Sequence, residues 1–415
     1  MPQKDRTKEF FIVKDIDEVL SYNRFFSITS EEYISINDCY ERIIAEDITS
    51  EEDIPDFNRS TVDGFALKAS STFGASESNA SYIKVIGNVE MGKPSNLVIG
   101  QGESTKIPTG GMLPSGADSV IMVEYTEPVD EFFIEAYKSV APGQNMIAIG
   151  EDLKKGEIIL PKGKKIGVQE IGVLAAIGKT SIKVHKKPLI GIISTGDEIV
   201  PQGIKPQFGQ VRDINTSTLS AMVKEAGCLT ISFGVLKDNF DILFDTALKA
   251  IESCDMVLLS GGSSVGTRDL TMDVLSALPE SKILVHGISI SPGKPTILAS
   301  VKNKALWGLP GHAVSAMVVF EIIVKPFIEY ISGILPQFVE KTIFPAYITR
   351  NIASTQGRCD FIRVKIIKQD GDLWVEPVLG KSGLINTIAK ADGLIKIDKN
   401  TEGIEKGSKV LVYPF

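Results

Sequence analysis

The amino-acid sequence predicts a multidomain α/β protein whose central domain is built on a parallel sheet. The chain has 415 residues, which is enough for two to four domains of about 150 residues each. Buried apolar strands alternate with helices between residues 187 and 331, a pattern typical of parallel βαβ units. Short strands punctuated by glycine and proline lie on both sides of this region and indicate smaller β domains.

Four domains are therefore expected along the chain. Each has its own pattern of apolar runs and turn residues. The expected boundaries are 1–48 with 147–186 for a discontinuous α+β domain, 49–146 for a β-rich domain, 187–331 for the α/β domain and 332–415 for a C-terminal β-barrel.

The discontinuous domain begins, on this interpretation, with two helices around a short strand in residues 13–48. Asp15 or Asp17 is expected to cap the first helix, and Asn37 to cap a second helix over 38–45. Later elements of the same domain are expected at 168–177, a helix, and at 181–185, a strand.

The α/β domain and the barrel can be divided into elements from their apolar runs. Strands of the α/β domain are expected at 189–194, 230–236, 256–260, 283–286, 296–299 and 305–309. Its helices are expected at 215–226, 239–253, 269–277 and 312–330. Strands of the barrel are expected at 343–349, 361–367, 373–377, 394–397 and 409–412.

Charge and composition exclude several classes of protein. The net charge of −8 disfavours a broad nucleic-acid-binding surface, which needs a dense basic face. The longest apolar stretch, Ala313–Val324, is too short to span a bilayer. No two of the four cysteines are close in sequence, so structural zinc and a disulfide scaffold are not expected. We therefore expect a cytoplasmic protein that binds neither nucleic acid nor membrane.

Unusual loops follow the predicted strands at the edge where open parallel sheets bind ligands. These loops are rich in glycine, serine and threonine, so that backbone N–H groups can approach a phosphate, and a helix start adds free donors. Each loop alone also fits an ordinary turn or cap, but four at one edge predict a site for a phosphorylated ligand. The loops are Ser194–Glu198, Arg212–Thr216, Ser260–Asp269 and Pro310–His312.

Acidic side chains near these loops suggest magnesium, which binds a few carboxylates together with ligand oxygens. They are Asp197, Glu198, Asp213 and Asp269. The three histidines are too scattered for a zinc site. Lys294, on the loop Ser291–Pro295, is either a fixed cation of the site or a solvated turn lysine.

Two further segments, at 53–66 and 107–118, have compositions too specific for ordinary loops. Both belong to the β-rich domain. If they are functional, they must reach a site on the α/β domain or on another subunit.

At these residues the chain resembles the MoeA family of molybdopterin molybdenumtransferases, and it is similar to the enzyme domain of gephyrin. The matching stretches occur in the family's order and cover nearly the whole chain. They are NRSTVDGFAL (58–67), PTGGMLPSGADSVIMVE (108–124), GED (150–152), STGDE (194–198), LSGGSSVGTRD (259–269), PGKP (292–295), GLPGHAVSA (308–316) and GRCDFIRV (357–364).

The resemblance implies the fold and the reaction. It implies a central domain of the molybdopterin-binding fold and a homodimer of four-domain subunits. It implies that adenylylated molybdopterin and molybdate are converted to molybdenum cofactor, with magnesium as cofactor and with release of AMP. A molybdopterin adenylyltransferase and recipient molybdoenzymes are further partners that it suggests.

The resemblance also implies site residues, motif by motif. The catalytic residues would be Asp63, Asp152, Glu198, Asp269 and Lys294, with Glu198 and Asp269 as magnesium ligands. Molybdate would be held by Lys294, Arg363 and Ser382. The other substrate-binding residues would be Thr109, Gly110, Ser194, Thr195, Gly196, Asp197, Asn215, Gly261, Gly262, Ser263, Ser264, Gly266, Pro292, Gly293, Gly311, His312 and Ser315.

Two positions depart from the family's pattern. Ser291 stands where a basic residue is usual, and its lack of charge would weaken oxyanion binding. Ala313 stands where proline is usual, and the loss of proline would loosen the start of the following helix. These changes leave a non-catalytic scaffold or a tungstate-inserting paralogue as alternatives. An adenylyltransferase, which resembles the α/β domain alone, is disfavoured by the flanking domains.

Overall fold

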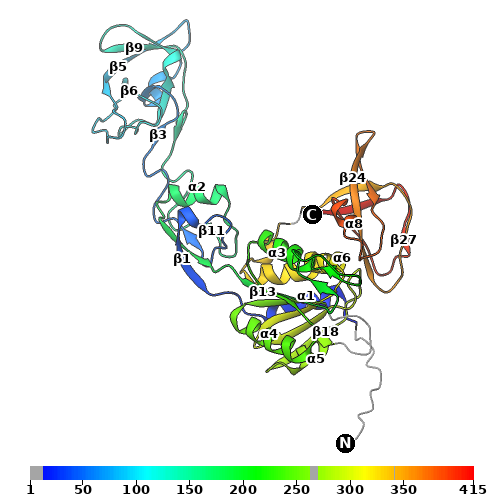
Figure 1. The fold of residues 1–415 in the computed structure, drawn as a ribbon. Helices are drawn as coiled ribbons and strands as arrows, with labels where there is room; N and C mark the ends of the chain where they lie inside the picture. Colours follow the sequence, from blue (N-terminus) through cyan, green and yellow to red (C-terminus); the bar gives the residue numbers. More distant parts are fainter. Residues whose placement is uncertain (1–12, 262–269, 341) are drawn as a thin grey trace, which may run out of the picture. The chain divides into compact units, whose positions relative to one another are not determined.

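The computed structural model describes residues 13–261, 270–340 and 342–415 (Figure 1). It divides into two compact units. The first comprises residues 1–46, 162–168 and 181–415, and the second comprises residues 47–161 and 169–180.

The N-terminal part of the first unit pairs with a strand far along the chain. Strand β1 (Glu31–Ser35) runs antiparallel to β12 (Ser181–His185). The helix α1 (Ile16–Ser21) is present as predicted, but the carboxylate of its N-cap residue Asp15 accepts hydrogen bonds from Ser289 Oγ and Lys399 Nζ and does not cap the helix. The 3₁₀ helices η1 and η2 cover Tyr22–Phe25 and Ile36–Asp38.

The predicted helix over 38–45 is wrong. Only the 3₁₀ turn η2 forms, and Glu41 has a φ of 60°, which interrupts any α-helix. Ile43 and Ile44 instead form β-bridges to Lys165 and Val184. Both isoleucines are buried, so tertiary burial of β-branched side chains outweighs the local helical pattern.

The second unit contains a six-stranded sheet, as the β-rich texture predicted. Its strand order is β7-β4-β6-β5-β9-β8. These strands are β4 (Gly64–Leu67), β5 (Ser81–Asn88), β6 (Glu103–Ile107), β7 (Ser119–Met122), β8 (Thr126–Pro128) and β9 (Phe133–Ala136). Two small antiparallel pairs accompany them: β3 (Arg59–Ser60) with β10 (Met146–Ile147), and β2 (Ile48–Thr49) with β11 (Ile158–Leu160). The helix α2 (Val168–Ala176) is present as predicted.

The α/β region of the first unit is built on a six-stranded sheet with the order β16-β13-β17-β21-β20-β18. The strands β16, β13, β17 and β21 are parallel to one another, as predicted. Their bounds are β13 (Leu189–Thr195), β16 (Leu229–Leu236), β17 (Met256–Ser260) and β21 (Lys304–Leu309).

The two remaining strands make the sheet mixed, which corrects the prediction of a parallel sheet. β20 (Ile297–Val301) is antiparallel to both β21 and β18 (Ser281–His286). Between β20 and β21 there are two residues, Lys302 and Asn303, with φ of 50° and 61°. Two consecutive residues with positive φ form the tight hairpin turn that reverses the chain at once, so a parallel connection is impossible there.

Helices cover both faces of this sheet (Figure 1). The helices α3 (Asn215–Glu225) and α6 (Ala313–Val319) contribute to one core cluster, and α4 (Phe240–Ser253) and α5 (Leu270–Ala277) to the other. The helix predicted over 312–330 is α6, followed by a π-helical turn (Phe320–Val324) and α7 (Lys325–Ile331). Pro326 near the start of α7 has no N–H for the carbonyl one turn earlier, which accounts for the irregular turn before it.

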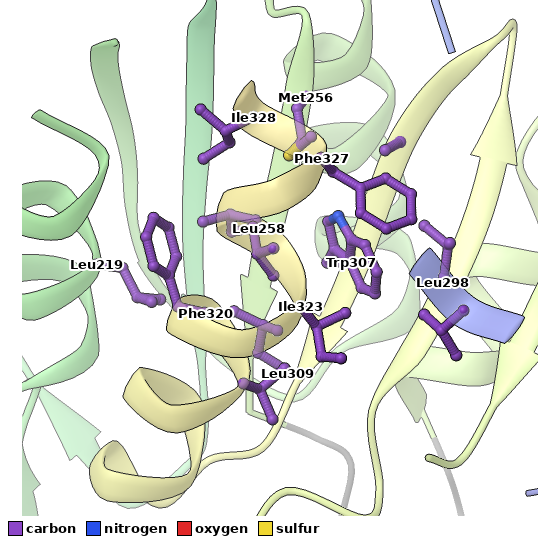
Figure 2. Close-up of a cluster of buried hydrophobic side chains, with 14 of the residues drawn as sticks. Leu219, Met256, Leu258, Leu298, Trp307, Leu309, Phe320, Ile323, Phe327 and Ile328 are labelled. Atoms are coloured by element: carbon purple, nitrogen blue, oxygen red, sulfur yellow. The ribbon is translucent and has the colours of Figure 1, made fainter. Parts of the chain in front are cut away.

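The larger core lies between the sheet and the helical run from α6 to α7 (Figure 2). The fully buried Trp307 of β21 packs edge-on against Phe327 of α7, with ring centroids 5.0 Å apart. Burial of this many aromatic and aliphatic side chains fixes the sheet's loops relative to the helices. Other members of the core in Figure 2 are Leu219, Met256, Leu258, Leu298, Leu309, Phe320, Ile323 and Ile328.

The C-terminal strands close into a five-stranded barrel, as predicted. The order β24-β25-β22-β28-β26 is closed by pairing of β24 with β26. The strands are β22 (Phe344–Ile348), β24 (Cys359–Gln369), β25 (Asp372–Pro377), β26 (Gly393–Ile397) and β28 (Lys409–Pro414). β19 (Ile290–Ser291), which precedes the Lys294 loop, adds to this sheet parallel to β24. The barrel is thus joined to the α/β region by backbone hydrogen bonds.

Candidate functional site

The ends of three parallel strands meet at one edge of the α/β sheet, as predicted. Ser194 of β13 pairs in register with Ser260 of β17, and Ser260 with Leu309 of β21. The loops that follow these strands therefore start side by side. This edge, from here called the carboxyl edge, is where an open sheet of this kind binds its ligand.

A buried carboxylate organises the first part of the carboxyl edge. Asp213 is 6% exposed, and its Oδ1 accepts from Ser194 Oγ at 3.1 Å and from the Thr216 N–H at 3.1 Å. The hydroxyls of Ser194 and Thr216 lie 2.9 Å apart. Asp213 therefore holds the first turn of α3 and ties it to β13, which is a structural use of one of the four acids predicted near a magnesium ion.

The amide of Asn215 joins the next two loops. Its Nδ2 donates to Ser260 Oγ at 2.5 Å and to the Gly311 carbonyl oxygen at 2.9 Å. The residue is 6% exposed. One residue of α3 thus connects the ends of β17 and β21.

Gly261 is required by the close approach of β17 to β13. A Cβ at this position would lie 2.1 Å from the carbonyl oxygen of Thr195, and its φ is 116°. The carbonyl oxygen of Gly261 accepts from Thr271 Oγ1 at 3.0 Å, which anchors the start of α5. At Gly311, by contrast, a Cβ would meet only the Cα of Gly261, at 3.7 Å.

Sequence reasoning missed Asp238. It follows β16 on the carboxyl edge, and its Oδ1 accepts from Thr195 Oγ1 at 2.7 Å. Gly196 N–H donates to Leu236 O at 3.1 Å, so this loop is held against the end of β16. The rule that ligands bind beyond strand ends, applied to β16 as it was to the other strands, would have found this acid.

The two acids of the STGDE motif are exposed. Asp197 Oδ1 accepts weakly from the Asp238 N–H at 3.4 Å, and the Asp197 carbonyl accepts from Lys237 Nζ at 2.7 Å. Among residues 13–261, 270–340 and 342–415, no three candidate metal ligands converge. The second predicted magnesium ligand, Asp269, lies outside the described residues, as do Gly262, Ser263, Ser264 and Gly266.

The residues predicted to hold molybdate lie where the barrel meets the α/β region. The guanidinium of Arg363 on β24 donates to the carbonyl oxygens of Gly380 at 2.8 Å and Val378 at 3.4 Å, and it is 8% exposed. Burial lowers the pKa of this guanidinium from its usual value. Ser382, two residues beyond Gly380, lies with its Oγ 2.9 Å from Nδ1 of His312. The structure therefore brings His312 and Ser382 together.

Lys294 is exposed on a loop whose backbone is tightly fixed. Its carbonyl oxygen accepts from the N–H groups of Ile288 at 3.0 Å and Thr296 at 2.9 Å. A Cβ on Gly293 would lie 2.3 Å from Val319 Cγ2, so this glycine packs directly on α6. Ser315 is buried on α6 and Pro292 is half-buried. The loop is rigid while its lysine side chain reaches solvent.

The predicted residues of the β-rich region belong to the second unit. Asp63 Oδ1 accepts from the Thr109 N–H at 2.7 Å and from Thr109 Oγ1 at 2.9 Å. These bonds, the backbone one first, hold the pKa of the exposed Asp63 carboxyl below its usual value. Gly110 N–H donates to Ser60 O at 2.8 Å, and the N–H of the exposed Asp152 donates to Ile54 O at 3.1 Å. The structure thus brings Asp63 and Thr109 together.

Three family models match consecutive parts of the chain. They are described as the MoeA N-terminal region (domain I and II), over residues 14–178, a probable molybdopterin binding domain, over 191–330, and the MoeA C-terminal region (domain IV), over 345–415. A molybdopterin molybdenumtransferase of Haemophilus influenzae is 33% identical over 93% of this chain and 94% of its own length. The chain belongs to the MoeA family.

Other members of the MoeA family agree with this assignment. A molybdopterin molybdenumtransferase of Bacillus subtilis is 31% identical, covering 92% of this chain and 89% of its own. A molybdopterin biosynthesis MoeA protein of Pyrococcus horikoshii, known as a crystal structure, superimposes with a TM-score of 0.82 at 36% identity, covering 97% of this chain and 99% of its own. The chain is thus a member of an enzyme family with a role in molybdenum cofactor biosynthesis.

The two departures from the MoeA pattern have definite places in the fold. Ala313 is the first residue of α6 and is 8% exposed, so the helix starts there without proline. Ser291 is half-buried in β19, in register with Asp360 of β24. Paired residues of a parallel ladder project to the same face, so residue 291 lies beside a buried carboxylate and not in open solvent.

We expect Gly261→Ala to destabilise the protein by about 2–4 kcal/mol, because the new Cβ overlaps a backbone oxygen and the residue has a left-handed φ. Thermal unfolding of this variant should therefore show a clearly lower midpoint. Gly311→Ala is the matched control, since its Cβ meets only an ordinary contact. Equal midpoints for the two variants would contradict the close approach of β13 and β17.

Proposed function

We propose that this MoeA-family protein inserts molybdate into adenylylated molybdopterin, which forms molybdenum cofactor and releases AMP. The observation that carries the proposal is the carboxyl edge. There, hydroxyls and glycines at the ends of three parallel strands are joined by Asp213 and Asn215 into one hydrogen-bonded surface. Names of curated relatives, molybdopterin molybdenumtransferases, support the choice of substrate.

The carboxyl edge suits a phosphate because its backbone can come close to a ligand. Gly261 and Gly311 present no side chains at the ends of β17 and β21. The buried hydroxyl side chains of Ser194, Thr195 and Ser260 lie at the ends of β13 and β17. They are hydrogen-bonded to Asp213, Asp238 and Asn215 respectively. The fixed dipoles of such a surface stabilise charge that develops on the phosphate as the adenylyl bond breaks, without reorganisation at that moment.

The second anion, molybdate, is proposed to bind beside the barrel. Arg363 presents a buried guanidinium fixed by two carbonyl oxygens. Ser382 offers a hydroxyl, and Lys294 offers an exposed cation on a loop whose backbone is tightly fixed. Cations and donors fixed in this way stabilise a doubly charged oxyanion next to the bond that breaks.

Magnesium is part of the proposal, with Glu198 and Asp269 as its ligands. When bound, the ion would neutralise phosphate charge. Of this pair, only Glu198 belongs to the described residues. No magnesium site is formed by the described residues alone. We therefore assign the steps above to the protein's own donors and cations.

We also propose a homodimer in which the site is completed by the second unit. Asp63 and Thr109 belong to that unit, whereas the carboxyl edge belongs to the first. The partner subunit would bring the Asp63 carboxylate to the phosphorylated ligand. The proposal retains the four expected domains, a cytoplasmic location, and exchange of substrate and product with a molybdopterin adenylyltransferase and with recipient molybdoenzymes. In the described residues, no helix is long and apolar enough to cross a membrane.

The direct test is release of AMP by the purified protein. It is incubated with adenylylated molybdopterin, magnesium and either molybdate or tungstate. AMP released with molybdate in preference to tungstate supports the proposal. Preference for tungstate would indicate an altered metal specificity, and no release with either oxyanion would indicate a scaffold that binds without catalysis.

Asp63→Asn should lower the rate of AMP release roughly a hundredfold or more. Asparagine keeps the shape of the side chain but removes the negative charge of a carboxyl group whose pKa is lowered. The asparagine Oδ1 can still accept both bonds from Thr109, so the thermal midpoint should not change. Asp130→Asn is a matched control, since Asp130 Oδ1 likewise accepts two hydrogen bonds in the same unit, here from two backbone N–H groups at 2.7 and 2.9 Å. A wild-type rate in Asp63→Asn would make that carboxylate a bystander.

Light scattering at micromolar concentration should give a mass of about 90 kDa, twice the 44.9 kDa of one chain. The physical reason is that, in the proposed function, Asp63 and Thr109 of the partner subunit complete the site. A mass near that of a single chain would contradict the proposed homodimer.

Ser291→Lys should lower the molybdate concentration for half-maximal AMP release about fivefold, equivalent to about 1 kcal/mol, because it adds a cation near Lys294. Asp360 already lies 2.9 Å from Arg358 Nε and accepts from Ser354 Oγ at 2.9 Å. Its charge is therefore largely compensated, and the added ammonium increases the net positive charge.

The gain in Ser291→Lys should diminish at high salt, since half-exposed charges are screened. Ser291→Met is the control of similar length without charge. Identical molybdate curves for lysine, methionine and serine at low salt would show that residue 291 does not influence the oxyanion.

A further inference from the structure

The amide of Asn215 carries an unused hydrogen-bond acceptor inside the carboxyl edge. Its Nδ2 is occupied by two acceptors, Ser260 Oγ and Gly311 O. Its Oδ1 is buried, and no donor in the described part of the chain reaches it. Native proteins pair nearly all such atoms, so an exception at a ligand-binding edge points to a functional use.

The orientation of this amide is fixed by its partners. The carbonyl oxygen of Gly311 can only accept, so it requires the Nδ2 side of the amide. A flipped amide would set two oxygens against each other. The free atom of Asn215 is therefore an acceptor, and it selects a hydrogen-bond donor.

Asn215 is also rigidly placed at the ligand edge. It is the first residue of α3, a helix of 11 residues, and the preceding Asp213 ties this helix to β13. Only 6% of the residue is exposed. A rigid, desolvated acceptor discriminates strongly between ligands that do and do not donate to it.

We infer that Asn215 Oδ1 accepts an N–H from an exocyclic amino group on a nitrogen heterocycle of the substrate and so helps to determine substrate specificity. This inference rests on the proposed function. Phosphate and molybdate oxygens present acceptors at neutral pH, so they do not satisfy Oδ1. The amino group of such a heterocycle only donates hydrogen bonds, so it requires an acceptor. A hydroxyl group can donate or accept, so it does not distinguish between the two.

Two heterocycles of adenylylated molybdopterin offer such a donor: the 6-amino group of adenine and the 2-amino group of the pterin. Two measurements on the wild-type protein show which of these amino groups is the donor. Calorimetry compares AMP with inosine monophosphate, in which a carbonyl replaces the adenine amino group. Inhibition of AMP release compares pterin with lumazine, in which a carbonyl replaces the pterin amino group.

In the arm that contains the true donor, we expect the carbonyl analogue to bind about tenfold more weakly, because a buried acceptor is then left unpaired. Weakening in the AMP arm identifies adenine as the donor, and weakening in the pterin arm identifies the pterin. Equal binding in both arms overturns the inference and leaves a structural water as the partner of Oδ1.

Variants of Asn215 test the atom itself. Asn215→Leu should lose the preference for the amino compound, because leucine has no acceptor at this place. Asn351→Leu is the control, since Asn351 Oδ1 already accepts from Lys406 N–H at 2.7 Å in the barrel. A preference that survives in a folded Asn215→Leu protein, as judged by thermal unfolding, overturns the inference.

The wild-type ligand series remains decisive if Asn215→Leu does not fold. Failure of the inference is also distinguishable from failure of the proposed function. AMP release with equal binding of all analogues rejects the role of Asn215 alone. No AMP release, together with no binding of AMP, rejects the proposed function as well.

Discussion

A single side-chain amide, that of Asn215, holds the carboxyl edge together. β17 and β21 reach this edge from distant parts of the chain, and their ladder brings Ser260 and Leu309 side by side. The two hydrogen bonds from Nδ2 to Ser260 and Gly311 then join the two loops to α3. With Asp213 fixing α3 to β13, the starting points of the surrounding loops are set before any ligand arrives.

Much of the α/β region could be predicted because its signals are local and strong. Buried strands such as Met256–Ser260 and amphipathic helices such as Phe240–Ser253 match the predicted ranges within one residue. The β20–β21 hairpin was not foreseen because Lys302 and Asn303 adopt positive φ without glycine. The short helix over 38–45 failed because burial of Ile43 and Ile44 against distant partners decided the local conformation.

The candidate site was predictable in outline, and less so in its details. Loops at strand ends were identified correctly, since topology alone brings them together. Which acids are ligands and which are structural depends on hydrogen-bond geometry. Asp213 proved to bind the first turn of α3, and Asp238 proved to be a partner of Thr195. No sequence pattern indicated that His312 and Ser382, 70 positions apart, lie in contact.

The pairing of β19 with β24 makes the C-terminal barrel inseparable from the rest of the first unit. Cys359 N–H donates to Ser289 O at 2.9 Å, and Ile290 and Ser291 pair with Cys359 and Asp360. A truncated chain ending before residue 344 would remove the backbone hydrogen-bond partners of this stretch, next to the Lys294 loop. Recombination between relatives should therefore exchange the α/β region and the barrel together. A chimaera joined at residue 332 must keep β19 and β24 able to pair.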